Sequence, residues 1–150
     1  MIAYLDGILT HKDPTYVIVE VHGVGYQVKI SLATFAVIKE LEKAKIYTYF
    51  HVKEDAHTLY GFADILEKQL FTDLISVNGV GPSTALVVLS SLAPDELRNA
   101  ILNDDIRVIQ GVKGIGAKTA QRLVLELKDK MKKEQWVADS DKQFSFNKGN

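Results

Sequence analysis

The sequence contains one nine-residue pattern twice, first as Val77-Asn78-Gly79-Val80-Gly81-Pro82-Ser83-Thr84-Ala85 and again as Val112-Lys113-Gly114-Ile115-Gly116-Ala117-Lys118-Thr119-Ala120. Each copy ends an apolar stretch, places Gly-apolar-Gly in a turn, and then begins a helix. Glycine suits such a turn because it adopts positive φ easily and lets another backbone approach closely. The repeat therefore predicts two hairpins, each between two helices, with the central Val80 or Ile115 packed into the core.

The peptide groups that follow each second glycine predict an anion site. The first amides of a helix have no intrahelical acceptor, and the helix dipole favours negative charge beside them. The second copy adds Lys113, Lys118 and Arg122, whereas residues 78–91 contain no charged side chain. We therefore expect the first hairpin to bind anions more weakly. The predicted phosphate-binding residues are Gly79, Val80, Gly81, Ser83, Thr84, Lys113, Gly114, Ile115, Gly116, Lys118, Thr119 and Arg122.

The chain changes its hydrophobic period near Asp64. Before this residue, short runs alternate like β-strands, and after it apolar residues recur at helical spacing. Pro82 and Pro94 each mark the beginning of a further helix. The predicted strands are residues 2–9, 16–22, 26–30, 46–52 and 57–62, with a turn at Gly23-Val24-Gly25 and a helix at residues 32–41.

This pattern predicts an α+β chain of two domains. Five short strands with one helix are compatible with a small closed barrel of the OB type. The predicted segments are a barrel over residues 1–63, an all-helical domain with two tandem hairpins over residues 64–134, and a flexible linker over the polar, aperiodic residues 135–150.

The composition of the chain limits the functions that it could have. The net charge is −1, which excludes a polycation that coats nucleic acid indiscriminately, so any DNA site must be local. The segment from Lys113 to Lys133 carries seven basic residues against Glu126 and Asp129. Cysteine is absent and the four histidines lack ligand-like spacing, so we expect neither a metal nor a cofactor. No apolar run is long enough to span a membrane, which predicts a cytoplasmic protein.

The Gly-apolar-Gly turn between two helices resembles the helix-hairpin-helix motif, which binds DNA phosphates without reading bases. Over nearly the whole chain the sequence also resembles the RuvA family, in both hairpins and in residues 20–26, 53–56, 59–62 and 122–128. The resemblance implies an OB-type barrel, tandem hairpins, and a homotetramer whose concave face holds a four-way (Holliday) DNA junction open and square-planar. It also implies a non-catalytic scaffold for recombination and DNA repair that assembles with the ATP-driven RuvB motor and the RuvC resolvase, as one tetramer or as two facing tetramers.

The resemblance assigns a separate role to Glu54 and Asp55. In the RuvA family the matching turn is an acidic pin near the four-fold centre, where carboxylates repel phosphates and keep the strands apart. Taken alone, these residues are also typical of a solvated hairpin tip. Two features depart from the family pattern: Ser83 replaces a basic residue often found there, and the small third domain that contacts RuvB is not part of the sequence up to Asn150.

Three other functions fit parts of the pattern. Residues 111–119 nearly spell the phosphate-binding loop of nucleotide-binding proteins, but Ala117 is inserted before Lys118, and a helical stretch precedes the loop where that fold requires a buried strand. A base-excision glycosylase would need a residue such as Asp129 in a pocket for a flipped base. A generic duplex-binding module would be a monomer with no preference for junctions.

Overall fold

The computed structural model describes the backbone of residues 1–148 and the side chains of residues 1–133. It confirms an α+β chain in which a closed five-stranded barrel precedes the helices. The strands follow the order β1-β2-β3-β5-β4 around the barrel, and only the β3–β5 pair is parallel. Their bounds are β1 (Tyr4–Lys12), β2 (Tyr16–Val21), β3 (Val24–Ile30), β4 (Lys43–Val52) and β5 (His57–Phe62), with α1 (Leu32–Ile38) between β3 and β4.

The turn between β2 and β3 corrects one detail of the prediction. His22 and Gly23 have φ values of 49° and 85°, and Val21 pairs with Val24 across the turn. Two successive positive φ values suit a two-residue hairpin turn, whose twist matches that of the flanking strands. The turn is therefore His22-Gly23, and Gly25 belongs to β3.

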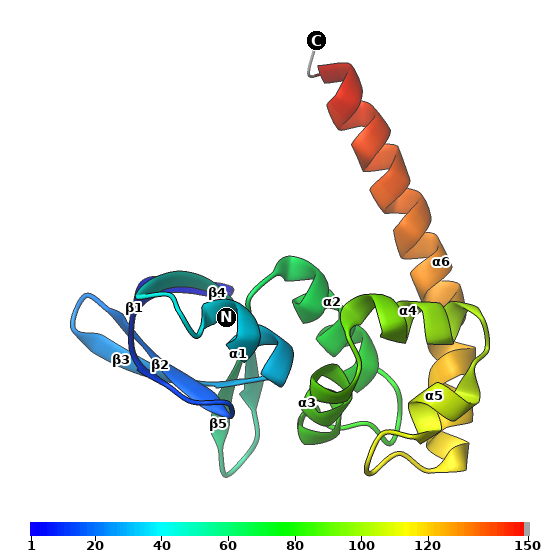
Figure 1. Ribbon diagram of the computed structural model, residues 1–150, viewed down its shortest axis with the longest axis horizontal. Helices are drawn as coiled ribbons and strands as arrows, with labels where there is room; N and C mark the ends of the chain where they lie inside the picture. Colours follow the sequence, from blue (N-terminus) through cyan, green and yellow to red (C-terminus); the bar gives the residue numbers. More distant parts are fainter. Residues whose placement is uncertain (149–150) are drawn as a thin grey trace.

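The helices lie beside the barrel, and α6 extends beyond both (Figure 1). Asp64 caps the first of them, because its carboxylate accepts the Glu67 N–H at 2.8 Å. Pro82 and Pro94 stand in the first turns of their helices, as the sequence predicts. The helices are α2 (Ile65–Ile75), α3 (Pro82–Ser91), α4 (Pro94–Leu102), α5 (Ile106–Gln110) and α6 (Ala117–Lys148).

Helix α6 continues through most of the segment that the sequence predicts as a linker. It runs to Lys148, and residues 149–150 lie outside the described part of the chain. No proline or glycine interrupts residues 117–148, so nothing in the sequence breaks the helix once it has begun. A linker function for residues 135–150 stays a prediction.

The barrel and the helices share one packed boundary. Phe71 of α2 contacts aromatic rings of the barrel, with centroid distances of 5.5 Å to Tyr49, 5.2 Å to Tyr60 and 4.9 Å to Phe62. Tyr60 and Phe62 consequently belong to the same apolar cluster as the helices. The barrel also has a core of its own, made of Leu5, Leu9, Val17, Val19, Val28, Ile30, Ile38 and Ile46.

A buried hydrogen-bond network crosses this boundary. The carboxylate of Glu67 in α2 accepts the hydroxyls of Ser31 at 2.9 Å and Thr34 at 2.5 Å, and Thr34 in turn accepts the Ala63 N–H at 3.0 Å. Burial raises the pKa of Glu67, and the two hydroxyls offset part of that rise. Because both hydroxyls belong to the barrel side, the network fixes how the barrel is oriented against α2.

Candidate nucleic-acid interface

The first hairpin joins α2 to α3. The Val77 N–H donates to Leu74 O at 3.1 Å, and the Val80 N–H donates to Val77 O at 3.0 Å, which closes the turn. Gly79 has a φ of 97°, a conformation that side chains of other residues rarely adopt. Gly81, with φ −92° and ψ 174°, is the N-cap of α3.

The second hairpin repeats this geometry between α5 and α6. The Val112 N–H donates to Ile109 O at 3.1 Å, and the Ile115 N–H donates to Val112 O at 3.2 Å. Gly114 has a φ of 90°, which matches Gly79. The structure thus confirms the two turns predicted from the sequence repeat and gives both of them the same geometry.

Val80 and Ile115 belong to the core, as the repeat predicts, and this limits their part in binding. Their side chains are buried, and their amides donate within the hairpin. Although both stand among the predicted phosphate-binding residues, the structure leaves them no free donor. Their contribution is to hold the turn in shape.

The amides that remain available follow the second glycine of each turn. In the first hairpin, Gly81, Ser83 and Thr84 have N–H groups with no protein acceptor among the described residues, while Pro82 has no N–H at all. In the second, the free amides belong to Gly116, Ala117, Lys118 and Thr119. Ala117 is not among the predicted phosphate-binding residues, although its amide is one of those that follow the second glycine and begin a helix.

The two hairpins lie against each other. Arg122 of α6 donates from Nη1 to the Asn78 carbonyl at 3.5 Å, and a Cβ on Gly79 would stand 4.0 Å from Thr119 Oγ1. Both turns lie at the lower edge of the helical part in Figure 1. The free amides of α3 and α6 therefore belong to one continuous region, and Arg122 bridges the hairpins as well as adding charge.

Gly81 and Gly116 show open space where a side chain would begin. A Cβ at either position would meet no atom within 4 Å, and neither residue has a positive φ. The fold itself therefore does not require glycine at these two positions. Close approach of a ligand backbone is the remaining physical reason for it.

The basic segment of the sequence divides into two groups in the structure. Lys128 pairs with Asp104 at 2.5 Å, and Lys130 pairs with the buried carboxylate of Asp73 at 3.1 Å. Lys113 and Lys118 are exposed beside the second hairpin and form none of the salt bridges of the described residues. Exposed lysines thus stand beside the second hairpin, whereas the first hairpin has none in its own sequence.

Glu54 and Asp55 form the tip of the β4–β5 hairpin. The Lys53 N–H donates to Ala56 O at 2.8 Å, so the two acidic residues occupy a two-residue turn, and both are exposed. In Figure 1 this tip points to the same lower edge as the two helical hairpins. One side of the molecule therefore carries an acidic tip and two amide-rich turns.

The described part of the chain does not show the sites that the alternative functions would need. Residues 111–119 connect helices α5 and α6, whereas a nucleotide-binding loop follows a buried strand. Asp129 is exposed on α6, and it lines neither the cavity beside α3 nor the cavity beside α4. No group of residues that could hold a metal ion occurs among the described residues, and none of the described helices is long and apolar enough to cross a membrane.

Comparison with known proteins follows the same division of the chain. Residues 1–61 match the family model described as RuvA N terminal domain, and residues 71–129 match the SAM-like helix-hairpin-helix tandem. A protein of Cytophaga hutchinsonii is 59% identical over 146 residues, which cover 97% of this chain and 73% of the relative. Proteins of Christiangramia forsetii and Amoebophilus asiaticus are 56% and 52% identical, over 89% of this chain and 69% of each relative. The chain belongs to the RuvA family.

The RuvA relatives are named Holliday junction branch migration complex subunit RuvA. The first of the two family-model matches ends within β5, and the second begins within α2. The second match also spans both hairpins, so the repeat quoted from the sequence is the feature that this family model describes.

Proposed function

We propose that this chain binds four-way Holliday junctions through their phosphates, as a subunit of a branch migration complex. The names of its relatives support this function. The observation that carries the proposal is the contact between the hairpins, in which Arg122 of one reaches Asn78 of the other. Two rows of free amides are thereby held beside each other, which would let the chain contact more than one phosphate of the DNA backbone.

The second hairpin is the stronger of the two proposed phosphate sites. It offers the amides of Gly116, Ala117, Lys118 and Thr119 together with the charges of Lys113 and Lys118. The first hairpin offers the amides of Gly81, Ser83 and Thr84 and the hydroxyls of Ser83 and Thr84. Since every one of these groups would meet the phosphate backbone, binding would not depend on base sequence.

The proposed assembly is a homotetramer, alone or as two tetramers facing each other, that holds the junction open and square-planar. Glu54 and Asp55 would then act as the acidic pin, because carboxylates at the crossover repel phosphates and prevent the arms from stacking. This chain would contribute no catalysis. The RuvB motor would supply ATP-driven movement through a third domain, and the RuvC resolvase would cut the junction.

Titration of a labelled four-way junction and of a linear duplex with the same arm sequences tests the proposal. We expect tighter binding to the junction, equal affinity for junctions of different sequence, and a steep loss of affinity with salt as counterions are released. Equal affinity for duplex and junction would favour the generic module, and strong sequence dependence would contradict phosphate binding. Native mass measurement should find four or eight chains of 16.7 kDa on each junction.

A further inference from the structure

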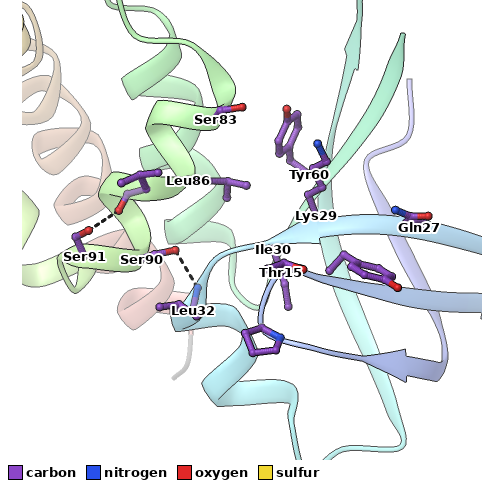
Figure 2. A pocket seen from close by; sticks show the side chains of 13 residues that line it. Thr15, Gln27, Lys29, Ile30, Leu32, Tyr60, Ser83, Leu86, Ser90 and Ser91 are labelled. Carbon is purple, nitrogen blue, oxygen red and sulfur yellow. Dashed lines mark hydrogen bonds between the residues drawn. The ribbon is translucent and has the colours of Figure 1, made fainter. Parts of the chain in front are cut away.

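A cavity of about 500 Å³ lies between the barrel and α3, next to the first hairpin. Its walls are mainly apolar, and Lys29 is the only charged residue among those that line it. Figure 2 shows Lys29 and Tyr60 on the barrel side, with Ser83 of α3 opposite them. The hairpin that lacks a cation in its own sequence therefore has one beside it, supplied by β3.

Lys29 is free to bind a ligand. Its side chain is exposed, and it takes part in none of the salt bridges of the described residues. It stands directly beside Tyr60 in the register of the parallel β3–β5 pair. The strand fixes the backbone of Lys29, and its long side chain can bring a compact positive charge to a phosphate beside Tyr60.

Tyr60 adds a hydroxyl to the same place. Its side chain is only 5% exposed, yet it lines the cavity and directs its hydroxyl toward Ser83. A side-chain hydrogen bond with Ser83 offsets part of the rise that burial causes in the pKa of Tyr60. A phosphate oxygen that entered between the two hydroxyls could accept from both of them in place of this bond.

We propose that Lys29, with the hydroxyls of Tyr60 and Ser83, forms a further DNA-phosphate contact that provides the charge missing from the first hairpin. The contact rests on the proposed junction binding and deepens it. Tyr60 lies on the strand that begins at the acidic tip, and Ser83 lies in the first turn of α3. A DNA strand that leaves the crossover at Glu54 and Asp55 and reaches the first hairpin would pass over Lys29.

Three variants test this contact in the complete chain. Lys29→Gln removes the charge, Lys29→Arg keeps it, and Lys43→Gln removes an exposed lysine at the opposite end of β4 from the acidic tip. We expect Lys29→Gln to weaken junction binding by roughly 5- to 10-fold near 0.1 M salt and to lower the slope of log affinity against log salt by about one for each lost contact. Lys29→Arg should bind within about 2-fold of the wild type, and so should Lys43→Gln.

The result that would overturn the contact is equal binding by Lys29→Gln and the wild type, or an equal loss in Lys29→Gln and Lys43→Gln. Lys118→Glu, in the second hairpin, separates the two levels of the proposal. If Lys118→Glu weakens binding and Lys29→Gln does not, the Lys29 contact fails and junction binding stands. If the wild type does not bind the junction, both fail.

Chemical modification of the wild type gives a second measurement that needs no substitution. An amine-reactive reagent should modify Lys29 in the free protein and much less in the presence of a four-way junction, while Lys43 should react equally in both. Undiminished modification of Lys29 in the junction complex would overturn the contact.

Discussion

At the scale of one residue, a substitution at Gly81 should affect the stability of the fold and the affinity for DNA in opposite ways. No side chain caps α3, and the φ and ψ of Gly81 suit an N-cap aspartate whose Cβ would meet nothing within 4 Å. Gly81→Asp should therefore stabilise the fold by a few tenths of a kcal/mol, because its carboxylate accepts the free amides of Ser83 or Thr84. The same carboxylate would occupy the proposed phosphate position, so junction affinity should fall by about 10-fold or more. Thermal unfolding and junction titration measure the two effects.

The matched control for Gly81→Asp is Gly79→Ala in the same turn. Gly79 has a φ of 97°, so alanine there should destabilise the fold by about 1–3 kcal/mol through backbone strain. The two neighbouring glycines would then change stability in opposite directions. Wild-type affinity of Gly81→Asp for the junction would show that no phosphate approaches α3.

Lys118 and Lys130 should also respond in opposite ways. Lys130 pairs with Asp73, whose second carboxylate oxygen is buried without a partner, whereas Lys118 is exposed beside the second hairpin. Lys118→Gln should weaken junction binding about 5-fold or more with little change in stability, equally for every junction sequence. Lys130→Gln should destabilise the fold by about 1–3 kcal/mol and leave affinity near that of the wild type. Urea unfolding and junction titration distinguish the two, and equal losses of affinity would contradict the division of the basic segment.

At the scale of elements, the contact between α1 and α2 depends on one buried carboxyl. Burial raises the pKa of Glu67 above its ordinary value of 4.5. The folded state therefore holds the proton more tightly than the unfolded state, and stability falls as pH rises from that ordinary value to the raised one. Glu67→Gln cannot titrate, so its free energy of unfolding should gain on the wild type as pH rises through this window, by about 1.4 kcal/mol for each unit of pKa elevation.

Denaturant unfolding of both proteins between pH 4 and pH 8 measures this difference. Glu126→Gln provides the control, since it removes an exposed carboxylate from α6 without touching the boundary between barrel and helices. A difference between Glu67→Gln and the wild type that stays constant with pH would show that Glu67 is not held in a buried, titrating state. Thr34→Val would then remain as an independent probe of the network.

Local patterns of the sequence were enough to predict most elements. They were not enough to predict the contacts between distant elements. The hairpins could be predicted because Gly79 and Gly114 recur within the same pattern and glycine is required where φ is positive. The Glu67 network could not, because a carboxylate in the first turn of a helix is usually a solvated cap residue, and its partners stand more than 30 residues earlier. The place of Lys29 beside the first hairpin could not be predicted for the same reason. Only the parallel β3–β5 pairing and the position of α3 bring it to Ser83.

At the scale of the whole molecule, a chain with a net charge of −1 must bind DNA through arrangement more than through total charge. The helical hairpins and the acidic tip lie toward one edge in Figure 1, and the packing of Phe71 on the barrel keeps them there. Attraction at the hairpins and repulsion at the tip would then act on the same DNA at different distances from its crossover. Such an opposition selects a branched DNA, because a linear duplex has no crossover to place at the tip.

The double variant Glu54→Gln with Asp55→Asn tests this opposition. Removing the repulsion should tighten junction binding several-fold at low salt, with a smaller gain at high salt where charges are screened. Affinity for linear duplex should not change, and strand exchange driven by the motor should slow, because the arms can then stack. The double variant Glu40→Gln with Glu42→Gln is the control, since it removes two exposed carboxylates from the loop before β4, at the opposite end of that strand from the tip. An equal gain of affinity in both double variants would show that the tip acts only as general surface charge. Unchanged junction affinity and an unchanged rate of strand exchange would show that it is not a pin.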